Sequence, residues 1–142
     1  MRFRDYFSVK HILFAVALIA LMMFFAVRQS NDMVKVYFED TSVDVVSSKY
    51  SMNIPYDMVE SAELADLAEA GERLAECYDD DIIRTGFWGN DTWGEYYIVA
   101  DLDPDNCIVV HLNDGRMFVF SRKSNAENEK LFETLQTYLS AN

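Results

Sequence analysis

Cysteine is scarce in this chain of 142 residues, which contains only Cys77 and Cys107. Two cysteines exclude a disulfide-rich scaffold and a zinc site built from four cysteine ligands. One disulfide is compatible with the sequence, because the two cysteines are an even pair thirty positions apart that could close a loop. Such a bridge stabilises a domain by about 2–4 kcal/mol. The alternative is two free thiols that are buried as small hydrophobic residues. The sequence leaves both alternatives open.

Histidine is equally scarce, and motifs of known catalysis are missing. His11 borders a hydrophobic run and His111 lies in a predicted strand, and neither has a base or a metal ligand at a typical spacing. The sequence also lacks the nucleophile elbow, the metalloprotease helix motif, the phosphate-binding loop and the dinucleotide-binding glycine pattern. We therefore expect a protein that is not an enzyme, with no catalytic residues and no cofactor.

A partial calcium-loop pattern lies between two predicted strands. Asp101, Asp103 and Asp105 alternate as the first ligands of such a loop do. The pattern then fails, because the sixth position is Asn106 instead of glycine and the twelfth is Leu112 instead of glutamate. The segment is predicted as a solvated loop, and we expect no metal site in the chain.

Basic residues are few, with 12 lysines and arginines against 24 aspartates and glutamates. Residues 29–142 hold 8 of the former and 23 of the latter, so this part carries 8 − 23 = −15 charges. Nucleic acids and anionic lipid surfaces both require a basic footprint, so we expect no nucleic-acid partner. The acidic surface favours solubility, and it could equally attract a basic partner or divalent cations.

One long hydrophobic run is the main positive feature. Residues 12–27, ILFAVALIALMMFFAV, contain no charged side chain. As a helix they cover about 24 Å, close to the hydrocarbon thickness of a bilayer once the preceding apolar residues are added. A helix buried in a soluble domain normally carries a polar face, and this run has none. We predict a single transmembrane helix that contacts the lipid bilayer through residues 12–27.

The residues around the run predict how it is inserted. No pair of small residues follows Ala26 at the spacing of a signal-peptidase site, so the helix is expected to remain as a signal anchor. Three basic residues precede the run and two follow it: Arg2, Arg4 and Lys10, then Arg28 and Lys35. The positive-inside rule then places the N-terminus in the cytoplasm. We predict a single-pass protein of the cell membrane, with residues 1–28 as N-terminus and helix and an extracytoplasmic domain at 33–142.

The domain at residues 33–142 follows a short polar linker, residues 29–32, and is large enough for one hydrophobic core. Alternating β-branched and aromatic residues, with turn residues between them, predict a series of short strands. These strands cover residues 33–39, 43–46, 50–54, 59–65, 82–88, 93–102, 107–112 and 116–121. From residue 93 onward the turn sequences are typical of successive hairpins, so we expect antiparallel pairing.

Two segments of the domain have a different pattern. Residues 66–78 are predicted as an irregular or helical insertion, because Leu64, Leu67, Leu74 and Tyr78 recur at near-helical spacing that Gly71 interrupts, and residues 79–81 are predicted as a charged loop. The C-terminal segment predicts a helix over residues 124–139, because Ser124 as N-cap and Glu127 form a capping box. Leu131 and Leu135 lie on the apolar face of this helix, which we expect to cover an open end of the sheet.

This layout resembles a pleckstrin-homology-like (PH-like) domain. The runs SMNIPYDMV at 51–59, GER at 71–73, RTGF at 84–87 and NDGRMFV at 113–119 are similar to bacterial PH-like domains that follow a membrane segment. The resemblance implies an antiparallel barrel or sandwich of about seven strands capped by a C-terminal helix, and it implies no catalytic residue. The loop at 39–42, EDTS, lacks the basic residues of phosphoinositide-binding members. A phosphoinositide ligand is therefore not expected.

The glycine- and aromatic-rich segment 86–94 is the best candidate contact surface. It could present Trp88 and Trp93 to a partner, because indole rings are frequent binding hot spots. Tryptophans beside a hairpin also commonly pack into the core. The sequence thus predicts a membrane-anchored binding module for a protein or peptide, contacted by this loop or by an open strand edge. The alternative is a structural subunit of a membrane complex or homo-oligomer without a ligand of its own.

Overall fold

The N-terminal part of the chain is one long apolar helix. The computed structural model describes the backbone of residues 3–31 and 33–142 and the side chains of residues 9–27 and 33–142. Helix α1 spans Phe3–Asn31. Within it, Val9–Val27 form a segment of 19 residues with a mean hydropathy of 2.3, long and apolar enough to cross a membrane. The predicted linker is instead helical as far as Asn31.

Several residues behind the topology prediction lie outside this description. Arg2 is not among the described residues, and the side chains of Arg4 and Arg28 are not described either. The side of the membrane on which the domain lies therefore stays a prediction. The chain divides into two compact units, Met1–Asp32 and Met33–Asn142, and the second is described from here on.

A small antiparallel sheet opens the second unit. Its strands, in spatial order, are β1 (Lys35–Phe38), β2 (Ser42–Val46) and β3 (Ser51–Pro55). Apolar residues at every second position of β2 and β3 give the sheet one buried face, to which Val43, Val45 and Ile54 contribute. After Pro55 a short 3₁₀ turn, η1 (Tyr56–Met58), leads to the second sheet.

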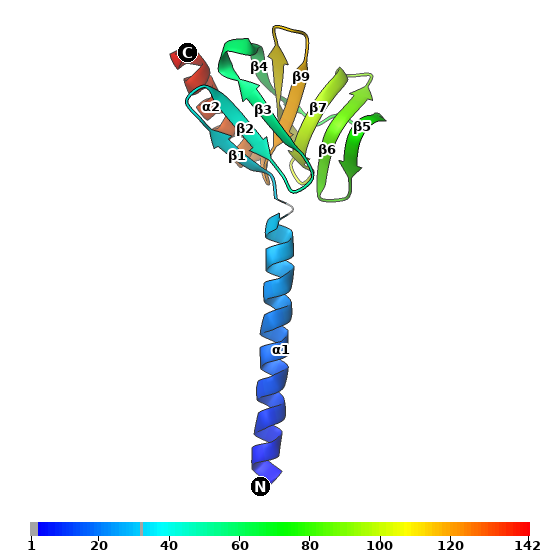
Figure 1. The fold of residues 1–142 in the computed structure, drawn as a ribbon, viewed down its shortest axis with the longest axis vertical. Coiled ribbons are helices and arrows are strands. Elements are labelled where there is room, and N and C mark those ends of the chain that lie inside the picture. The colour runs from blue at the N-terminus through cyan, green and yellow to red at the C-terminus, as the bar shows by residue number, and fades with distance from the viewer. Residues whose placement is uncertain (1–2, 32) are drawn as a thin grey trace. The chain divides into compact units, whose positions relative to one another are not determined.

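The second sheet is larger and open. Its six strands are β4 (Val59–Asp66), β5 (Glu72–Asp79), β6 (Ile83–Asn90), β7 (Gly94–Asp101), β8 (Asn106–Leu112) and β9 (Met117–Ser121). They lie in the order β4-β8-β9-β7-β6-β5, and Figure 1 shows the two sheets side by side. Because β4 and β5 form separate edges, the domain is a sandwich, not a closed barrel. The predicted mostly-β fold after an apolar helix is confirmed, and the described residues form nine strands instead of about seven.

The main hydrophobic core, called core 1 here, fills the space between the two sheets. Its buried members are Val34, Val43, Val45, Met52, Ile54, Tyr56, Ile83, Val99, Ile108, Val110, Leu112, Phe118, Phe120 and Leu135. Helix α2 (Asn125–Ala141) adds Leu135 from one side and lies against β4 and β8. The ring of Tyr138 in this helix stacks on the ring of Phe38 in β1, with 5.3 Å between the ring centroids. The predicted role of this helix in covering the sheet is confirmed.

The start of α2 also follows the prediction. Ser124 is the N-cap, and its hydroxyl accepts a hydrogen bond from the Glu127 backbone N–H at 3.2 Å. The Glu127 carboxylate lies 3.6 Å from Arg122 Nε. Burial of the apolar face of α2, together with this cap, explains why the helix forms at this point.

A second cluster, core 2, covers the other face of the six-stranded sheet. Its buried members are Trp88, Tyr96, Ile98, Ala100, Cys107, Val109 and Val119. The connection from β4 to β5 must pass from one edge of the sheet to the other, since these strands are its two edges. Residues 67–71, the crossing segment, make this passage, and Leu67 and Ala70 pack against core 2. Both faces of the sheet are therefore buried.

The prediction for residues 66–78 is wrong from residue 72 onward, because residues 72–78 belong to strand β5, whereas residues 67–71 form the irregular crossing segment. This edge strand is irregular: its register with β6 shifts twice, between Arg73 and Ala75 and between Ala75 and Tyr78. Glu76 has a positive φ of 51° at this bulge. Gly86 of β6, with φ of 106°, lies so close that a Cβ there would be 2.9 Å from the Cys77 Cα. An irregular, mostly exposed strand lacks the strict alternation that identifies strands from sequence.

The predicted hairpin from 93–102 to 107–112 is also wrong. Strand β9 lies between β7 and β8, pairing antiparallel with β8 and parallel with β7. As a result, Ile98 and Ala100 of β7 face core 2, whereas Ile108 and Val110 of β8 face core 1. The turn-like residues between β7 and β8 permit either a hairpin or a crossover, and the sequence does not distinguish the two.

Candidate functional site

The two predicted contact residues lie in different environments. Trp88 is 2% exposed and belongs to core 2, and its indole N–H donates to the Thr85 carbonyl at 2.8 Å. The Trp88 ring is therefore unavailable as a contact surface in this structure. Trp93 is half-buried in the β6–β7 turn, and its ring meets Tyr96 edge-on at 5.0 Å. A binding role for Trp93 stays a prediction.

Three side chains of the sheet fix the crossing segment through its backbone carbonyls. The Tyr96 hydroxyl donates to Ala70 O at 2.6 Å, Asn90 Nδ2 to Glu69 O at 2.9 Å, and Arg84 Nη1 to Ala68 O at 3.2 Å. Burial raises the pKa of Tyr96 to about 12, so its hydroxyl keeps the proton it donates at neutral pH. The segment is thus held by hydrogen bonds in addition to apolar contacts.

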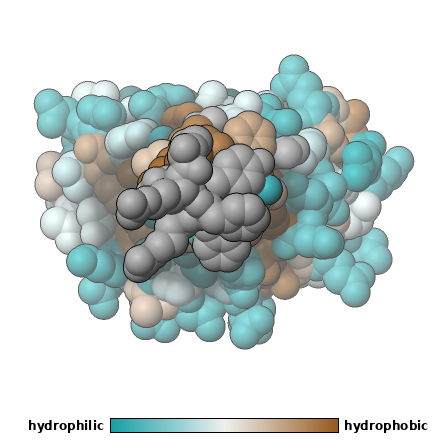
Figure 2. All heavy atoms as spheres, turned by 90° about the horizontal axis from the view of Figure 1, so that it is seen from below, coloured by the Kyte–Doolittle hydropathy of each residue, from teal (hydrophilic) through white to brown (hydrophobic). Residues whose placement is uncertain are grey.

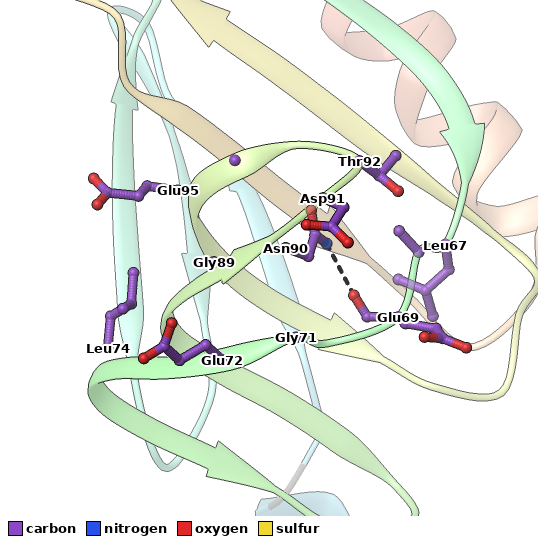
Figure 3. A pocket seen from close by; sticks show the side chains of 12 residues that line it. Leu67, Glu69, Gly71, Glu72, Leu74, Gly89, Asn90, Asp91, Thr92 and Glu95 are labelled. Carbon is purple, nitrogen blue, oxygen red and sulfur yellow. Dashed lines mark hydrogen bonds between the residues drawn. The ribbon is translucent and has the colours of Figure 1, made fainter.

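Asn90 links the crossing segment to the turn that carries Trp93. Its amide nitrogen bonds Glu69 O, while its Oδ1 accepts from the Trp93 backbone N–H at 2.6 Å. Figure 3 shows the crossing segment beside the turn with Asn90, Asp91 and Thr92, and the hydrogen bond to Glu69. One amide side chain therefore sets the spacing between the two walls of a groove.

This acidic groove has a volume of about 830 Å³ and is formed by the crossing segment, the start of β5 and the β6–β7 turn. Its lining residues are Leu67, Ala68, Glu69, Gly71, Glu72, Leu74, Gly89, Asn90, Asp91, Thr92, Gly94 and Glu95. The lining holds four carboxylates and no lysine, arginine or histidine. Among the described residues, no three carboxylate, imidazole or thiol groups converge on a point that could hold a metal ion. The carboxylates are instead distributed along the groove.

Two arginines on the strands that border the groove, Arg73 of β5 and Arg84 of β6, contact other groups of the protein. The guanidinium groups of Arg73 and Arg84 lie over the Trp88 ring, with Cζ atoms 5.3 and 5.9 Å from the ring centroid. Arg84 is largely buried, with its Nε 3.6 Å from Asp79. These arginines stabilise core 2 and the crossing segment, so the carboxylates of the groove lining remain available to a positively charged ligand.

The remaining candidates lie elsewhere. Cys77 and Cys107 are both free thiols. Cys107 is fully buried, which raises its pKa to about 12, and Cys77 is half-buried with its Sγ 2.8 Å from Phe87 O. His111 is partly exposed on β8, with Nε2 3.5 Å from a Glu63 oxygen.

The partial calcium pattern forms a turn between β7 and β8. Asp101 is 6% exposed, and its Oδ1 accepts from the Asp103 backbone N–H at 3.1 Å. Burial raises the pKa of Asp101. A carboxylate that is used inside its own turn differs from the converging ligands of a calcium loop.

The acidic groove itself was not predicted from the sequence. Its carboxylates come from two segments, Glu69 and Glu72 on one and Asp91 and Glu95 on the other, that only the fold brings together. The one available signal was the glycine-rich segment at 86–94, which does form one wall. No family model matches the chain, and neither a curated protein nor a solved structure matches it.

Proposed function

We propose that this chain is a single-pass membrane protein whose β-sandwich domain is a binding module without enzymatic activity. In this proposal the acidic groove receives a positively charged segment of a protein or peptide. The observation that carries it is the groove lining, with four carboxylates and no cationic side chain. The half-buried Trp93 belongs to the same β6–β7 turn, between the lining residues Thr92 and Gly94 in sequence. Electrostatic attraction speeds the encounter, and a partly exposed indole supplies apolar contact area.

The size of the groove and its fixed walls support this proposal. A volume of about 830 Å³ lies in the range of small-ligand sites and of pockets for a few side chains. Asn90 and Tyr96 hold the crossing segment in place before any ligand arrives. A preformed groove loses little conformational entropy on binding, which favours affinity.

The finer assignments belong to the same proposal. The domain is taken as PH-like because short strands are followed by a C-terminal helix that covers the core; the parallel pair of β7 and β9 departs from the purely antiparallel arrangement. The domain is placed outside the cytoplasm because Arg2, Arg4 and Lys10 precede the apolar run. A reporter fused after Asn142 should be active only outside the cytoplasm, and activity inside would reverse this orientation.

The groove can be tested with the full chain in detergent micelles and a short lysine-rich peptide as probe. Changing Glu72 and Glu95 together to glutamine removes two groove charges while keeping side-chain shape. We expect the peptide to bind about tenfold more weakly, as loss of close charge complementarity would produce. Isothermal titration calorimetry at constant ionic strength measures the change.

A matched control separates the groove from the general negative charge of the domain. Glu129 and Glu133 are exposed on α2 and outside the groove lining. Their double change to glutamine removes the same number of negative charges from the chain and should leave peptide binding nearly unchanged. Equal weakening by both double variants would refute a specific groove. Self-association without peptide binding would instead support the structural-subunit alternative.

A further inference from the structure

The free edge of strand β1 carries unpaired backbone groups. The Glu39 N–H donates to Ser42 O at 2.9 Å, and Tyr37 pairs with Asp44 in the same register. Hydrogen-bonded and non-hydrogen-bonded residue pairs alternate along an antiparallel ladder. The backbone N–H and C=O groups of residues 35, 37 and 39 therefore bond to β2. The N–H and C=O groups of Val36 and Phe38 therefore point away from β2. In the described part of the chain, β1 pairs with β2 alone.

One protein group already binds this edge. The Arg122 guanidinium, just before α2, donates through Nη1 to the carbonyl of Val34. Backbone carbonyls of alternate residues point to the same side of a strand. The carbonyl of Val34 therefore lies on the same open side of β1 as those of Val36 and Phe38. Arg122 thus marks where the edge faces α2 and shows that the edge accepts hydrogen bonds from that direction.

The edge of β1 differs from the edges of the larger sheet. Its register with β2 is regular over all four residues, whereas both β4 and β5 contain register shifts. Bulges of that kind protect an edge from pairing with another chain, and β1 has neither a bulge nor a proline. Among these three edges, β1 is the one whose geometry suits an added strand.

A second groove, the β1–α2 groove, runs along this edge with a volume of about 420 Å³. Val36, Phe38 and Leu131 give it an apolar floor, and the polar lining consists of Arg122, Glu127, Lys130 and Thr134. Arg122 is engaged by Val34 O and by Glu127. Among the described residues, Lys130 has no ion-pair partner. The exposed charge left at this groove is therefore positive, in a domain where residues 33–142 carry 8 − 22 = −14 charges.

We propose that the β1–α2 groove receives an extended, partly apolar segment of a partner protein, which adds as a strand to the edge of β1 and places a carboxylate beside Lys130. Backbone hydrogen bonds to Val36 and Phe38 supply affinity, and the apolar floor selects alternate side chains. A second copy of β1 fits less well, because it carries Lys35 and no carboxylate. This surface is independent of the acidic groove.

The test uses the isotopically labelled full chain in detergent micelles and a short peptide that alternates valine and threonine around one central glutamate. We expect the peptide to shift the amide resonances of Val36 and Phe38 and to slow their hydrogen exchange. Methylation of every second peptide nitrogen should abolish binding, because it removes the donors needed for strand pairing. Unchanged Val36 and Phe38 resonances would overturn the proposal.

Variants locate the charge and the edge separately. Lys130→Glu should lower the affinity for the glutamate peptide by about tenfold. Lys123 is exposed but outside the groove lining, so Lys123→Glu should leave that affinity unchanged. Val36→Pro should prevent pairing without a large loss of melting temperature, because the deleted N–H lies on the open side. The Glu72 and Glu95 double variant should bind this peptide normally, which separates this proposal from the acidic groove.

Three other outcomes would also refute it. Equal affinity for peptides with a central glutamate and with a central lysine would mean that Lys130 does not favour a carboxylate in the bound segment. Binding of the methylated peptide would mean that strand addition is not the mode of contact. Concentration-dependent shifts at Val36 and Phe38 without peptide would mean that a second copy occupies the edge.

Discussion

The two faces of the six-stranded sheet are buried by different means. On one face, core 1 is covered by a second sheet and by α2, and it contains fourteen buried residues against seven in core 2. On the other face, a five-residue crossing segment covers core 2 with few apolar side chains. Hydrogen bonds from Tyr96, Asn90 and Arg84 hold that segment. Core 1 therefore depends on apolar area, and core 2 on a large aromatic ring and polar bonds to backbone.

The largest effect is expected in core 2, from Trp88→Ala. The ring is almost fully buried and bonded to Thr85 O, so its loss should lower the free energy of unfolding by about 4 kcal/mol. Trp93→Ala is the matched control, because its half-buried ring should cost only about 1–2 kcal/mol. Urea denaturation measures both. Equal, small losses would mean that core 2 adds little stability.

Core 1 should respond next to Leu135→Ala. This side chain is fully buried between α2 and the sheet, so its removal should cost about 3 kcal/mol by lost transfer free energy and a cavity. Gln136→Ala, one position further and exposed, should stay within about 0.5 kcal/mol. A loss below that of Trp93→Ala would contradict a role for α2 in covering core 1.

The hydrogen bonds of the crossing segment can be weakened without opening a cavity. Tyr96→Phe removes only the hydroxyl and leaves Ala70 O without its partner, which should cost about 1–2 kcal/mol. Hydrogen exchange should then accelerate in residues 67–71 and less in β2. Tyr37→Phe is the control, because that ring is 49% exposed. Exchange that accelerates equally throughout would mean that the segment does not open separately.

The smallest changes in the free energy of unfolding, up to about 1 kcal/mol, should come from replacing two aspartates, and the two changes should have opposite signs. Burial raises the pKa of Asp101, so its contribution to stability falls as pH rises through that pKa, and Asp101→Asn should stabilise the domain at pH 7. For Asp80, burial acts in the raising direction, but hydrogen bonds from Ile83, Ile82 and Tyr78 outweigh it and lower the pKa.

The contribution of Asp80 is therefore present above its ordinary pKa and lost as pH falls through the folded value, so Asp80→Asn should destabilise the domain at pH 7. Thermal unfolding at pH 7 and near pH 4 measures both variants against the unchanged chain. Both differences should shrink in acid. Shifts of the same sign at pH 7 would contradict the assigned causes.

The comparison of the two faces also explains what the sequence could predict. Core 1 elements have strong local patterns: alternating valines in β2, and Ser124 followed by an apolar stripe in α2. The crossing segment and β5 lack such patterns, because bulges and a positive φ at Glu76 break the alternation. The placement of β9 between β7 and β8 depends on pairing with strands that are distant in sequence. Local periodicity therefore predicts neither the irregular strand β5 nor the position of β9 in the sheet.

The same limits apply to the candidate site. The sequence identifies the glycine-rich segment 86–94, but Trp88 is buried in core 2 with Val109 and Val119, which come from strands much later in the chain. The acidic groove needs Glu69 and Asp91 on facing walls, and the β1–α2 groove needs Arg122 beside Val34. Each is a tertiary contact between segments whose own patterns are unremarkable.

The close approach at Gly86 has a consequence for how sequences related to this one would vary. A Cβ at that position would lie 2.8 Å from the Glu76 carbonyl carbon, and φ of 106° is unfavourable for any other residue. Relatives that keep the bulged edge must therefore keep glycine there, while the exposed carboxylates of the groove are sterically free to change. An invariant glycine at position 86 of β6 would therefore reflect the close approach of the edge strand β5, whereas ligand preference would be found at the groove positions that vary.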